Sequence, residues 1–266
     1  MSQGGLVTDP VAEDAVAALL SALRRLFGAL PAGEWADGAD LVSYAAHLLL
    51  PRFNGVVVLG PGASRRAAEA WLDELAFRGL PYAVLSRPAA APWVVSLAAA
   101  HGLTVVEREP LMCLLDPSGV VETTPGVGGD QLVIHAVDPT DEEQVGVSVQ
   151  LLANGFEAPV ELLAPLVAPE LLTLAGVTAY LGRTAGEPCT TGLGVVGDGH
   201  VGVFNIATPP VHRNRGFGHA ITARVVADGV RAGAHRAYLQ ASPMGFGVYE
   251  RMGFRTVETW TCFYPS

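Results

Sequence analysis

The residues best suited to chemistry lie at 211–219, VHRNRGFGH, where a predicted strand gives way to a predicted helix. Backbone N–H groups at a helix N-terminus point outward, and the helix dipole adds about half a positive charge there. Gly216 and Gly218 let the backbone approach phosphate oxygens closely, while Arg213 and Arg215 offer charge-assisted hydrogen bonds. The stretch therefore predicts a loop that binds a diphosphate; the alternative is a turn with packing glycines and solvated arginines.

A second stretch, 237–254, reads AYLQASPMGFGVYERMGF. It predicts a strand that ends at Ser242, followed by a short helix that presents Tyr249 ahead of Gly253 and Phe254. On its position alone, Tyr249 fits a core aromatic residue whose hydroxyl is satisfied. The two stretches are informative as a pair, because the phosphate-type loop comes first and this Tyr follows it.

Taken together, the two stretches resemble the GNAT acetyltransferase superfamily, over about residues 131–266. The acetyl-CoA loop of that family follows the pattern Arg/Gln-x-x-Gly-x-Gly/Ala, which is matched by Arg213, Gly216 and Gly218. A second family motif, Asn-x-x-Ala-x-x-Leu/Val-Tyr-x-x-x-Gly-Phe, is matched at Val248, Tyr249, Gly253 and Phe254, with Ser242 and Gly245 in place of Asn and Ala. The joint match is much more specific than either motif alone.

The resemblance implies an N-acetyltransferase that moves an acetyl group from acetyl-CoA, its co-substrate, directly to an amine. The N–H groups of Ile206 and Thr208 would hold the pantetheine arm and polarise the thioester carbonyl. Tyr249 would protonate the departing thiolate as general acid, and Ser242 would bond the pantetheine or orient Tyr249. The implied cofactor-binding residues are Ile206, Ala207, Thr208, Arg213, Asn214, Arg215, Gly216, Phe217, Gly218, His219, Ser242 and Tyr249, of which Tyr249 and Ser242 are also implied as catalytic.

The attacking amine must lose a proton, and the sequence leaves the base open. Many members of the family supply a carboxylate from the strand at 200–207, where this chain has none. Glu157 and Glu161, His212 or a chain of water molecules are the alternatives. The acceptor, a small-molecule or peptide amine, would be set by the loops around 153–162 and by the linker, and the acidic surface mildly favours a cationic one.

The elements that position these residues follow from periodicity and breakers. In the first half the sequence predicts helices at 11–27, 40–50, 64–79 and 92–101, strands at 53–60, 82–86 and 103–115, and a linker at 117–130. In the second half it predicts strands at 131–138, 177–185, 189–197, 200–207, 236–241 and 254–264, and helices at 141–153, 159–176, 217–232 and 246–252. The helix at 159–176 is broken by prolines, and a capping box formed by Thr140 and Glu143 begins the helix at 141.

The two halves repeat one order of elements, strand–helix–strand–helix–strand, at 53–115 and 200–264. The first copy has GPGASRRA in place of the Arg-x-x-Gly-x-Gly loop and lacks a Tyr before a Gly-Phe pair. The sequence therefore predicts an α/β (α+β) fold in which a mixed, mostly antiparallel central sheet is flanked by helices, with two GNAT-like units in tandem. Residues 1–125 would form a degenerate N-terminal domain and 126–266 the catalytic acetyl-CoA-binding domain.

Two other functions compete with this interpretation. The stretch VVVLGPGASR at 56–65, followed by Ser86 and Arg87, suits a dinucleotide loop and a 2′-phosphate, which would indicate an NADP-binding oxidoreductase. A catalytically silent acyl-CoA-binding or regulatory protein fits the missing strand carboxylate and the change from Asn to Ser at 242. The segment that begins at Glu109 in the strand at 103–115 is interpreted as structural.

Composition excludes several classes of function. The net charge is −10 with no Lys, and no basic tract suits a nucleic-acid backbone. The longest apolar runs fall far short of the roughly 20 residues of a membrane-spanning helix, and no secretory signal is seen. Cys113, Cys189 and Cys262 are isolated, so neither a metal site nor a disulfide framework is expected. We expect a cytoplasmic monomer or homodimer that binds no metal, nucleic acid or membrane.

Overall fold

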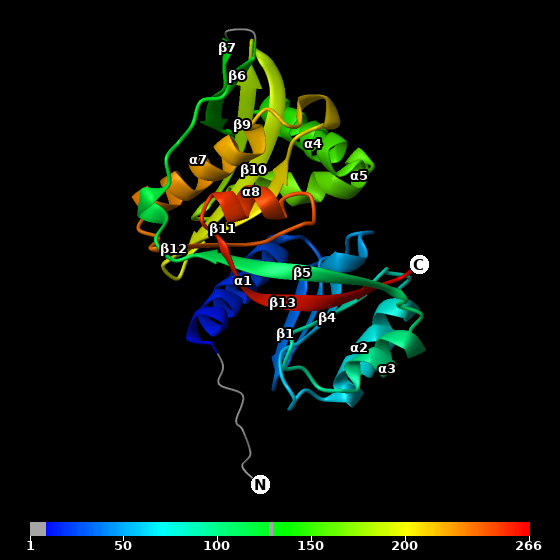
Figure 1. Ribbon diagram of the computed structural model, residues 1–266. Coiled ribbons are helices and arrows are strands. Elements are labelled where there is room, and N and C mark those ends of the chain that lie inside the picture. The colour runs from blue at the N-terminus through cyan, green and yellow to red at the C-terminus, as the bar shows by residue number, and fades with distance from the viewer. Residues whose placement is uncertain (1–8, 128–129) are drawn as a thin grey trace.

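The computed structural model describes residues 9–127 and 130–266. One sheet of eleven strands crosses the whole molecule in the order β1-β2-β3-β4-β13-β5-β12-β11-β10-β9-β8 (Figure 1). Its strands are β1 (Glu34–Gly38), β2 (Leu41–Ala45), β3 (Asn54–Val58), β4 (Ala83–Ser86), β5 (Val105–Leu114), β8 (Val133–Ala136), β9 (Val177–Thr184), β10 (Glu187–Gly197), β11 (His200–Ala207), β12 (Arg236–Gln240) and β13 (Arg255–Tyr264). The pair β6 (Gly126–Val127) and β7 (Asp130–Gln131) forms a separate ribbon.

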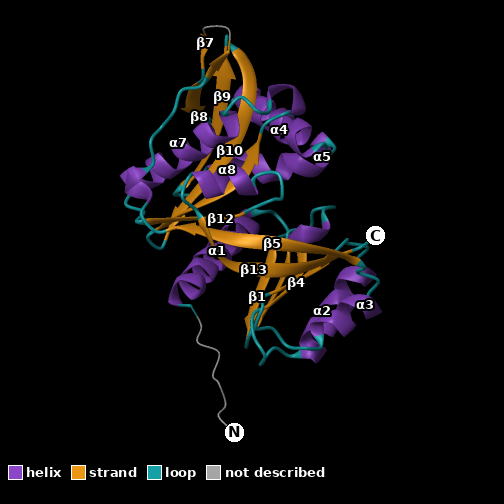
Figure 2. Cartoon of the chain, viewed as in Figure 1, coloured by secondary structure: helices purple, strands orange, loops and turns teal. Residues whose placement is uncertain are grey.

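Helices lie on both faces of this sheet (Figure 2). They are α1 (Pro10–Ala29), α2 (Arg65–Phe77), α3 (Val94–Ala100), α4 (Glu142–Phe156), α5 (Val160–Leu163), α6 (Pro169–Leu172), α7 (Phe217–Arg231) and α8 (Phe246–Arg251). Short 3-10 turns occur at η1 (Pro51–Phe53), η2 (Pro117–Gly119), η3 (Ala164–Val167) and η4 (Pro210–His212). All pairs in the large sheet are antiparallel except β3–β4 and β11–β12. The predicted fold class, a mixed and mostly antiparallel sheet flanked by helices, is confirmed.

The two halves exchange their last strands. Strand β5, from the first half, lies between β12 and β13, and β13, the last strand of the second half, lies between β4 and β5. In the middle of this arrangement Leu111 pairs with Gln240 on one side and with Glu258 on the other. The predicted domain division at 125/126 stays a prediction. Each of the two segments contributes one strand that lies between strands of the other segment, β5 from the first and β13 from the second.

The predicted internal repeat appears as two equivalent sets of elements. The order β3–α2–β4–α3–β5 in the first half corresponds to β11–α7–β12–α8–β13 in the second, and each set contains one parallel strand pair. The last strands of the two sets, β5 and β13, run antiparallel beside each other. The sheet is therefore continuous across the two copies (Figure 1).

Alternating side chains divide the core between two faces of the sheet. Val57, Leu111 and Tyr238 belong to one large cluster with residues of α1, α4, η3 and α6, and we call this side the α1 face. Their neighbours on the same strands, such as Val56 and Leu239, belong to clusters beneath α2 and α3 or beneath α7. We call this opposite side the α7 face.

Helix α1 is fixed across the centre of the sheet by polar contacts with both halves. The Tyr238 hydroxyl of β12 donates to the Ala18 carbonyl at 3.1 Å. Arg87, which follows β4, donates to Glu13 of α1 and to Glu258 of β13, each at 2.7 Å. These contacts tie the N-terminal helix to strands that are far away in the sequence.

The prediction of a helix at 40–50 is wrong, because this segment contains strand β2, paired with β1 and β3. Val42 and Tyr44 face the α1 side while Leu41 and Ala45 face the other, so the strand is buried on both faces. A strand without a polar face shows no alternation of apolar and polar residues, and its run of apolar residues resembles a helix. Strand β1 was not predicted at all.

The predicted capping box of Thr140 and Glu143 is also wrong, by one residue. Asp141 is the N-cap of α4 and accepts from the Gln144 N–H at 3.1 Å, while the Gln144 side-chain amide donates back to Asp141 at 2.7 Å. The Thr140 hydroxyl donates instead to Asp138, at 2.7 Å. The helix predicted at 159–176, with breaks at its prolines, consists of α5, η3 and α6. The other predicted helices and strands occur, with ends shifted by a few residues.

We expect the chain to unfold in a single transition, because the exchanged strands join both halves in one sheet. Leu75→Ala on α2 and Leu152→Ala on α4 each remove a buried side chain and should lower the stability of the whole chain by about 2–5 kcal/mol. Circular dichroism and calorimetry during thermal unfolding measure this.

Phe77→Ala is the matched control, because Phe77 lies on the same helix as Leu75 with 88% of its surface exposed. This change should alter stability by no more than about 0.5 kcal/mol. Two separate transitions, each shifted by only one of the two leucine variants, would contradict the single cooperative unit.

Candidate functional site

Strands β11 and β12 separate partway along their length. They pair in parallel only from His200 opposite Arg236 to Gly202 opposite Tyr238, although β11 continues to Ala207 and β12 to Gln240. Near its end β11 carries a bulge, where its register with β10 shifts and Asn205 takes a left-handed φ of 52°. A bulge bends its strand and disrupts local pairing. The sheet therefore opens between the ends of β11 and β12, and Ile206, Ala207 and Thr208 lie beside this opening.

The loop after β11 turns sharply into α7. Asn214 and Gly216 have left-handed φ angles of 62° and 81°, and α7 begins at the buried Phe217. No side chain among the described residues caps α7. The first N–H groups of a helix have no partner within the helix, so this end presents donors. A Cβ at Gly218 would lie 3.8 Å from the Thr208 hydroxyl, which leaves room beside these donors.

Arg213 holds the loop in place. Its Nε donates to the Thr208 carbonyl at 3.1 Å, and its Nη2 donates to the Gly155 carbonyl at 2.8 Å and to Glu157 at 3.2 Å. The side chain thus ties the end of β11 to the end of α4. The sequence predicted this guanidinium as a phosphate ligand, whereas the structure uses it to position the loop. Arg215, two residues later, is exposed at the same end of α7.

His219 lies in the first turn of α7. Its Nδ1 is 3.3 Å from the hydroxyl of Thr123. Burial and the positive charge of Arg251 lower the pKa of His219 below its ordinary value. The imidazole is therefore mainly neutral at neutral pH, where it can donate or accept a hydrogen bond but adds little charge.

Tyr249 lies on α8, packed against the core of the second half. Its ring contacts Phe254 with centroids 6.0 Å apart, and a Cβ at Gly245 would come within 2.8 Å of it. Burial raises the pKa of Tyr249 to about 12, so the hydroxyl stays protonated at neutral pH and has a proton to give. Ser242 is exposed, and its hydroxyl accepts from the Gly245 N–H at 3.2 Å, which fixes the turn ahead of Tyr249.

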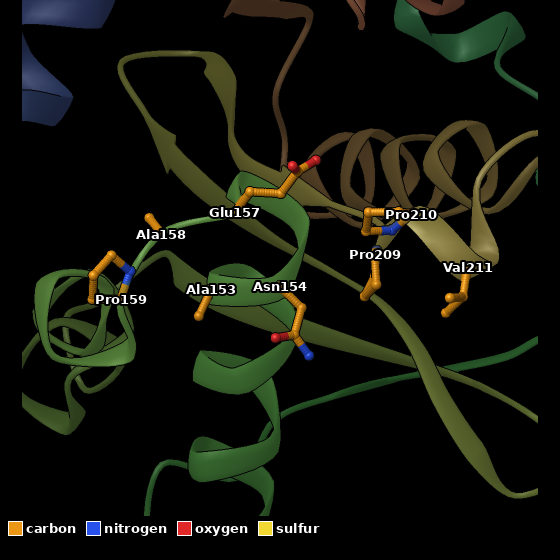
Figure 3. Close-up of a pocket in the computed structure, with 8 residues that line it drawn as sticks. All are labelled: Ala153, Asn154, Glu157, Ala158, Pro159, Pro209, Pro210 and Val211. Carbon is orange, nitrogen blue, oxygen red and sulfur yellow. The ribbon is translucent and has the colours of Figure 1, made fainter.

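The three side chains considered as the base differ in their surroundings. Glu157 ends α4 and faces a cleft of about 460 Å³, whose far side is formed by Pro209, Pro210 and Val211 (Figure 3). Its carboxylate is paired with Arg213. Glu161 is exposed on α5. The Nδ1 of His212 is buried and has no hydrogen-bond partner within the part of the chain that the structure describes.

In the first half the equivalent place is closed. Strands β3 and β4 stay paired from Gly55 opposite Ala83 to Val58 opposite Ser86, and the chain continues the pairing with a hydrogen bond from the Arg87 N–H to the Val58 carbonyl. No opening like that between β11 and β12 forms along this described pair. A pantetheine arm therefore has no passage here.

The loop after β3 is filled by a carboxylate of the protein itself. Asp40 accepts from the Gly62 N–H at 2.9 Å, and a Cβ at Gly60 would lie 2.6 Å from the same carboxylate. Ser64 caps α2 by accepting from the Ala67 N–H at 3.3 Å. The donors that a bound phosphate would need are thus already satisfied. Sequence analysis missed Asp40, because no local pattern links it to a loop some twenty residues later.

The dinucleotide-binding interpretation of the first half therefore does not fit. Besides the occupied loop, the side chain of Arg87 is only 11% exposed and is bound by Glu13 and Glu258. It is not placed to receive a 2′-phosphate. The flanking strand β13 is antiparallel to β4, unlike the parallel sheet of a doubly wound fold.

Cys113, Cys189 and Cys262 are free and buried. Among the described residues, no group of three or more His, Cys, Asp or Glu side chains could hold a metal ion. In the same residues no single helix is long and apolar enough to cross a membrane. The helix pair Glu142–Phe156 and Val160–Leu172, bent by 111°, would be long and apolar enough only if its two members are counted together.

Known proteins resemble this chain in structure but not in sequence. No family model matches the sequence, and no curated protein matches it. A GCN5-related N-acetyltransferase from Kribbella flavida is similar over 96% of this chain and 95% of its own, with a TM-score of 0.67 and 21% identity. One from Sphaerobacter thermophilus is similar over 96% and 93%, with a TM-score of 0.56 and 15% identity.

A tandem protein of the same kind is also similar. It is a tandem GNAT protein from the clavulanic acid biosynthesis pathway, matched over 88% of this chain and 83% of its own, with a TM-score of 0.54 and 15% identity. These identities establish the fold rather than a shared substrate. The chain therefore has the tandem fold of the GNAT acetyltransferases.

Proposed function

We propose that this protein is an acetyl-CoA-dependent N-acetyltransferase with a single acyl-CoA site, in its second half. The observation that carries this proposal is the opening between β11 and β12 beside the uncapped N-terminus of α7. The equivalent place in the first half is closed by paired strands and by the Asp40 carboxylate. The similarity in fold to GNAT acetyltransferases supports acyl transfer as the reaction.

Acetyl-CoA would bind with its diphosphate at the first turn of α7. The N–H groups of residues 214–219 would contact the phosphate oxygens, and the exposed Arg215 would add a charge-assisted hydrogen bond. The pantetheine arm would follow the end of β11, with Ile206 and Thr208 supplying backbone donors. Ser242 and Tyr249 would border the thioester from the side of β12 and α8.

The reaction would be a direct attack. The amine nitrogen forms a bond to the thioester carbonyl carbon, and the negative charge that develops on the carbonyl oxygen is held by backbone N–H groups of β11. The C–S bond then breaks, and the CoA thiolate takes the proton of Tyr249. The proton lost by the amine goes to Glu157, Glu161, His212 or water, and Glu157 is the one that faces the cleft beside the loop.

A catalytically silent acyl-CoA-binding protein is the second candidate. It is favoured by the absence of Asp or Glu from β11 and by the pairing of Glu157 with Arg213, which occupies the nearest carboxylate. Both candidates bind acetyl-CoA, so only release of CoA in the presence of amines separates them.

Gly218→Asp should weaken acetyl-CoA binding by at least about tenfold, because a carboxylate in the first turn of α7 repels the diphosphate. The same carboxylate suits the helix dipole, and the position has room for a side chain, so the Tm should not fall. Calorimetric titration with acetyl-CoA and thermal unfolding measure the two effects.

Gly146→Asp on α4 is the control of equal charge, since nothing lies within 4 Å of a Cβ at this position. It should leave acetyl-CoA affinity unchanged. Unaltered binding by the Gly218→Asp variant would place the diphosphate elsewhere and contradict the proposal.

Tyr249→Phe should lower kcat by about 10²-fold while acetyl-CoA affinity stays the same, because only the proton donor is lost. CoA release with a panel of amines measures kcat. Tyr82→Phe is the control, since Tyr82 is a partly buried Tyr of the first half that bonds His101 at 3.1 Å. Equal kcat in wild type and Tyr249→Phe would remove Tyr249 from the mechanism.

The raised pKa of Tyr249 sets an expectation for pH dependence. An ordinary Tyr loses its proton near pH 10, whereas burial holds the pKa of this hydroxyl at about 12. The acid thus stays protonated as pH rises, and kcat should not decline between about pH 8 and about pH 10. A decline in that range that is absent from the Tyr249→Phe variant would show an ordinary pKa.

A further inference from the structure

A polar cluster that the proposed mechanism does not use lies where η1, β5, β12 and β13 meet. It consists of Arg52 and Glu109 from the first half and Gln240 and Tyr264 from the second. Arg52 forms an ion pair with Glu109 and donates to Tyr264 at 2.9 Å and to Gln240 at 2.7 Å. The Tyr264 hydroxyl donates to Glu109 at 2.7 Å. We call these four residues the seam cluster.

The seam cluster borders the opening between β11 and β12. Gln240 is the last residue of β12, and the next N–H, that of Ala241, donates to the Pro110 carbonyl at 2.9 Å. Glu109 therefore lies beside the chain that leads directly to Ser242. The cluster is adjacent to the residues that would border the thioester.

The cluster and the acyl-CoA loop approach this opening from opposite faces of the sheet. Gln240 alternates with Leu239, which packs on the α7 face, and it shares its side of β12 with Tyr238, which bonds α1. The loop before α7 lies on the other face. An amine held at the seam cluster would therefore meet the thioester carbonyl through the gap between the strands, opposite the CoA.

The cluster is charged and partly exposed. The side chain of Arg52 is 34% exposed and that of Glu109 is 13% exposed. Burial by itself would raise the pKa of Glu109, but the charge of Arg52 and the hydrogen bonds from Arg52 and Tyr264 outweigh it and lower the pKa. The carboxylate is therefore ionised at neutral pH and stands beside a fixed positive charge.

Two N–H donors next to this pair have no acceptor. Gln240 Nε2 and Trp260 Nε1 are buried without a hydrogen-bond partner among the described residues, and Trp260 pairs directly with Glu109 across the two strands. A buried donor without an acceptor destabilises the folded protein. Trp260 is fully buried, so the donor that a ligand oxygen can satisfy is the amide of the half-buried Gln240.

We propose that the seam cluster is the acceptor-binding end of the transfer site, and that the acceptor is an amine that also carries a carboxylate, as a free amino acid does. This rests on the proposed acetyltransferase function. Glu109 binds the ammonium group, and Arg52 with the amide of Gln240 binds the carboxylate. A polyamine carries only positive charges, so Arg52 would repel it and such an acceptor is disfavoured. This differs from the cationic acceptor that the acidic surface suggested.

The test compares free L-amino acids with their carboxamides and with spermidine, in an assay of CoA release. At least one amino acid should be used with kcat/KM about tenfold or more above that of its amide, because only the acid can pair with Arg52. Arg52→Lys keeps the charge but loses the planar fork, and it should reduce this preference for the acid.

Glu109→Gln should raise the KM of the amino acid at least about tenfold while the affinity for acetyl-CoA stays unchanged. Glu258→Gln is the matched control, a carboxylate on the same face that is bound by Arg87, and it should alter stability without altering either constant. If Glu109→Gln does not fold, Gln240→Met, which leaves the ion pair intact, should raise the same KM.

The outcomes separate this inference from the proposed function. If acetyl-CoA does not bind, or if it binds and no amine releases CoA, the proposed function fails and this inference with it. If some amine is acetylated, the inference is overturned by equal use of acids and amides, by a preference for spermidine, by no use of any amino acid, or by an acceptor KM that Glu109→Gln and Gln240→Met leave unchanged.

Discussion

The pairing of β5 with β13 is the contact on which the rest of the molecule depends. It runs in antiparallel register from Val105 opposite Tyr264 to Cys113 opposite Arg255, and each strand also pairs with the other half of the chain. Separating the halves would leave backbone donors and acceptors on both strands without partners. The same pairing places Glu109 of the first half beside the end of β12, where the second half opens.

The two copies differ at the turn from a strand into a helix, in whether side chains of the protein satisfy the backbone donors there. After β11 the helix begins without a side-chain cap, and Arg213 ties the turn to α4 from outside. After β3 the Asp40 carboxylate and the Ser64 hydroxyl satisfy the donors from within. One turn therefore leaves backbone donors without a side-chain acceptor, and the other contains a carboxylate that accepts from it. Under the proposal of a single acyl-CoA site, this difference is the reason that only the second copy carries it, while the first copy completes the sheet and the cluster around Arg52.

Sequence reasoning succeeded where the information is local. The loop at Gly216, the helix that follows it and the repeat of elements were predicted because turns and helices have short-range patterns. It failed at β2, which is buried on both faces, and at the cap of α4, where Asp141 and Thr140 are neighbours and both are favourable N-cap residue types. The clamp of Arg213 on Gly155 and the contact of Arg52 with Tyr264, 212 residues away, depend on tertiary folding alone. No spacing in the sequence encodes them, so Glu109 was interpreted as structural.

The central claim is that one copy holds the acyl-CoA site and the other is closed. Calorimetric titration of the full chain with acetyl-CoA tests this most directly, because it counts binding sites without requiring an acceptor. We predict one molecule of acetyl-CoA bound per chain. Binding of two molecules per chain, or of none, would contradict the account.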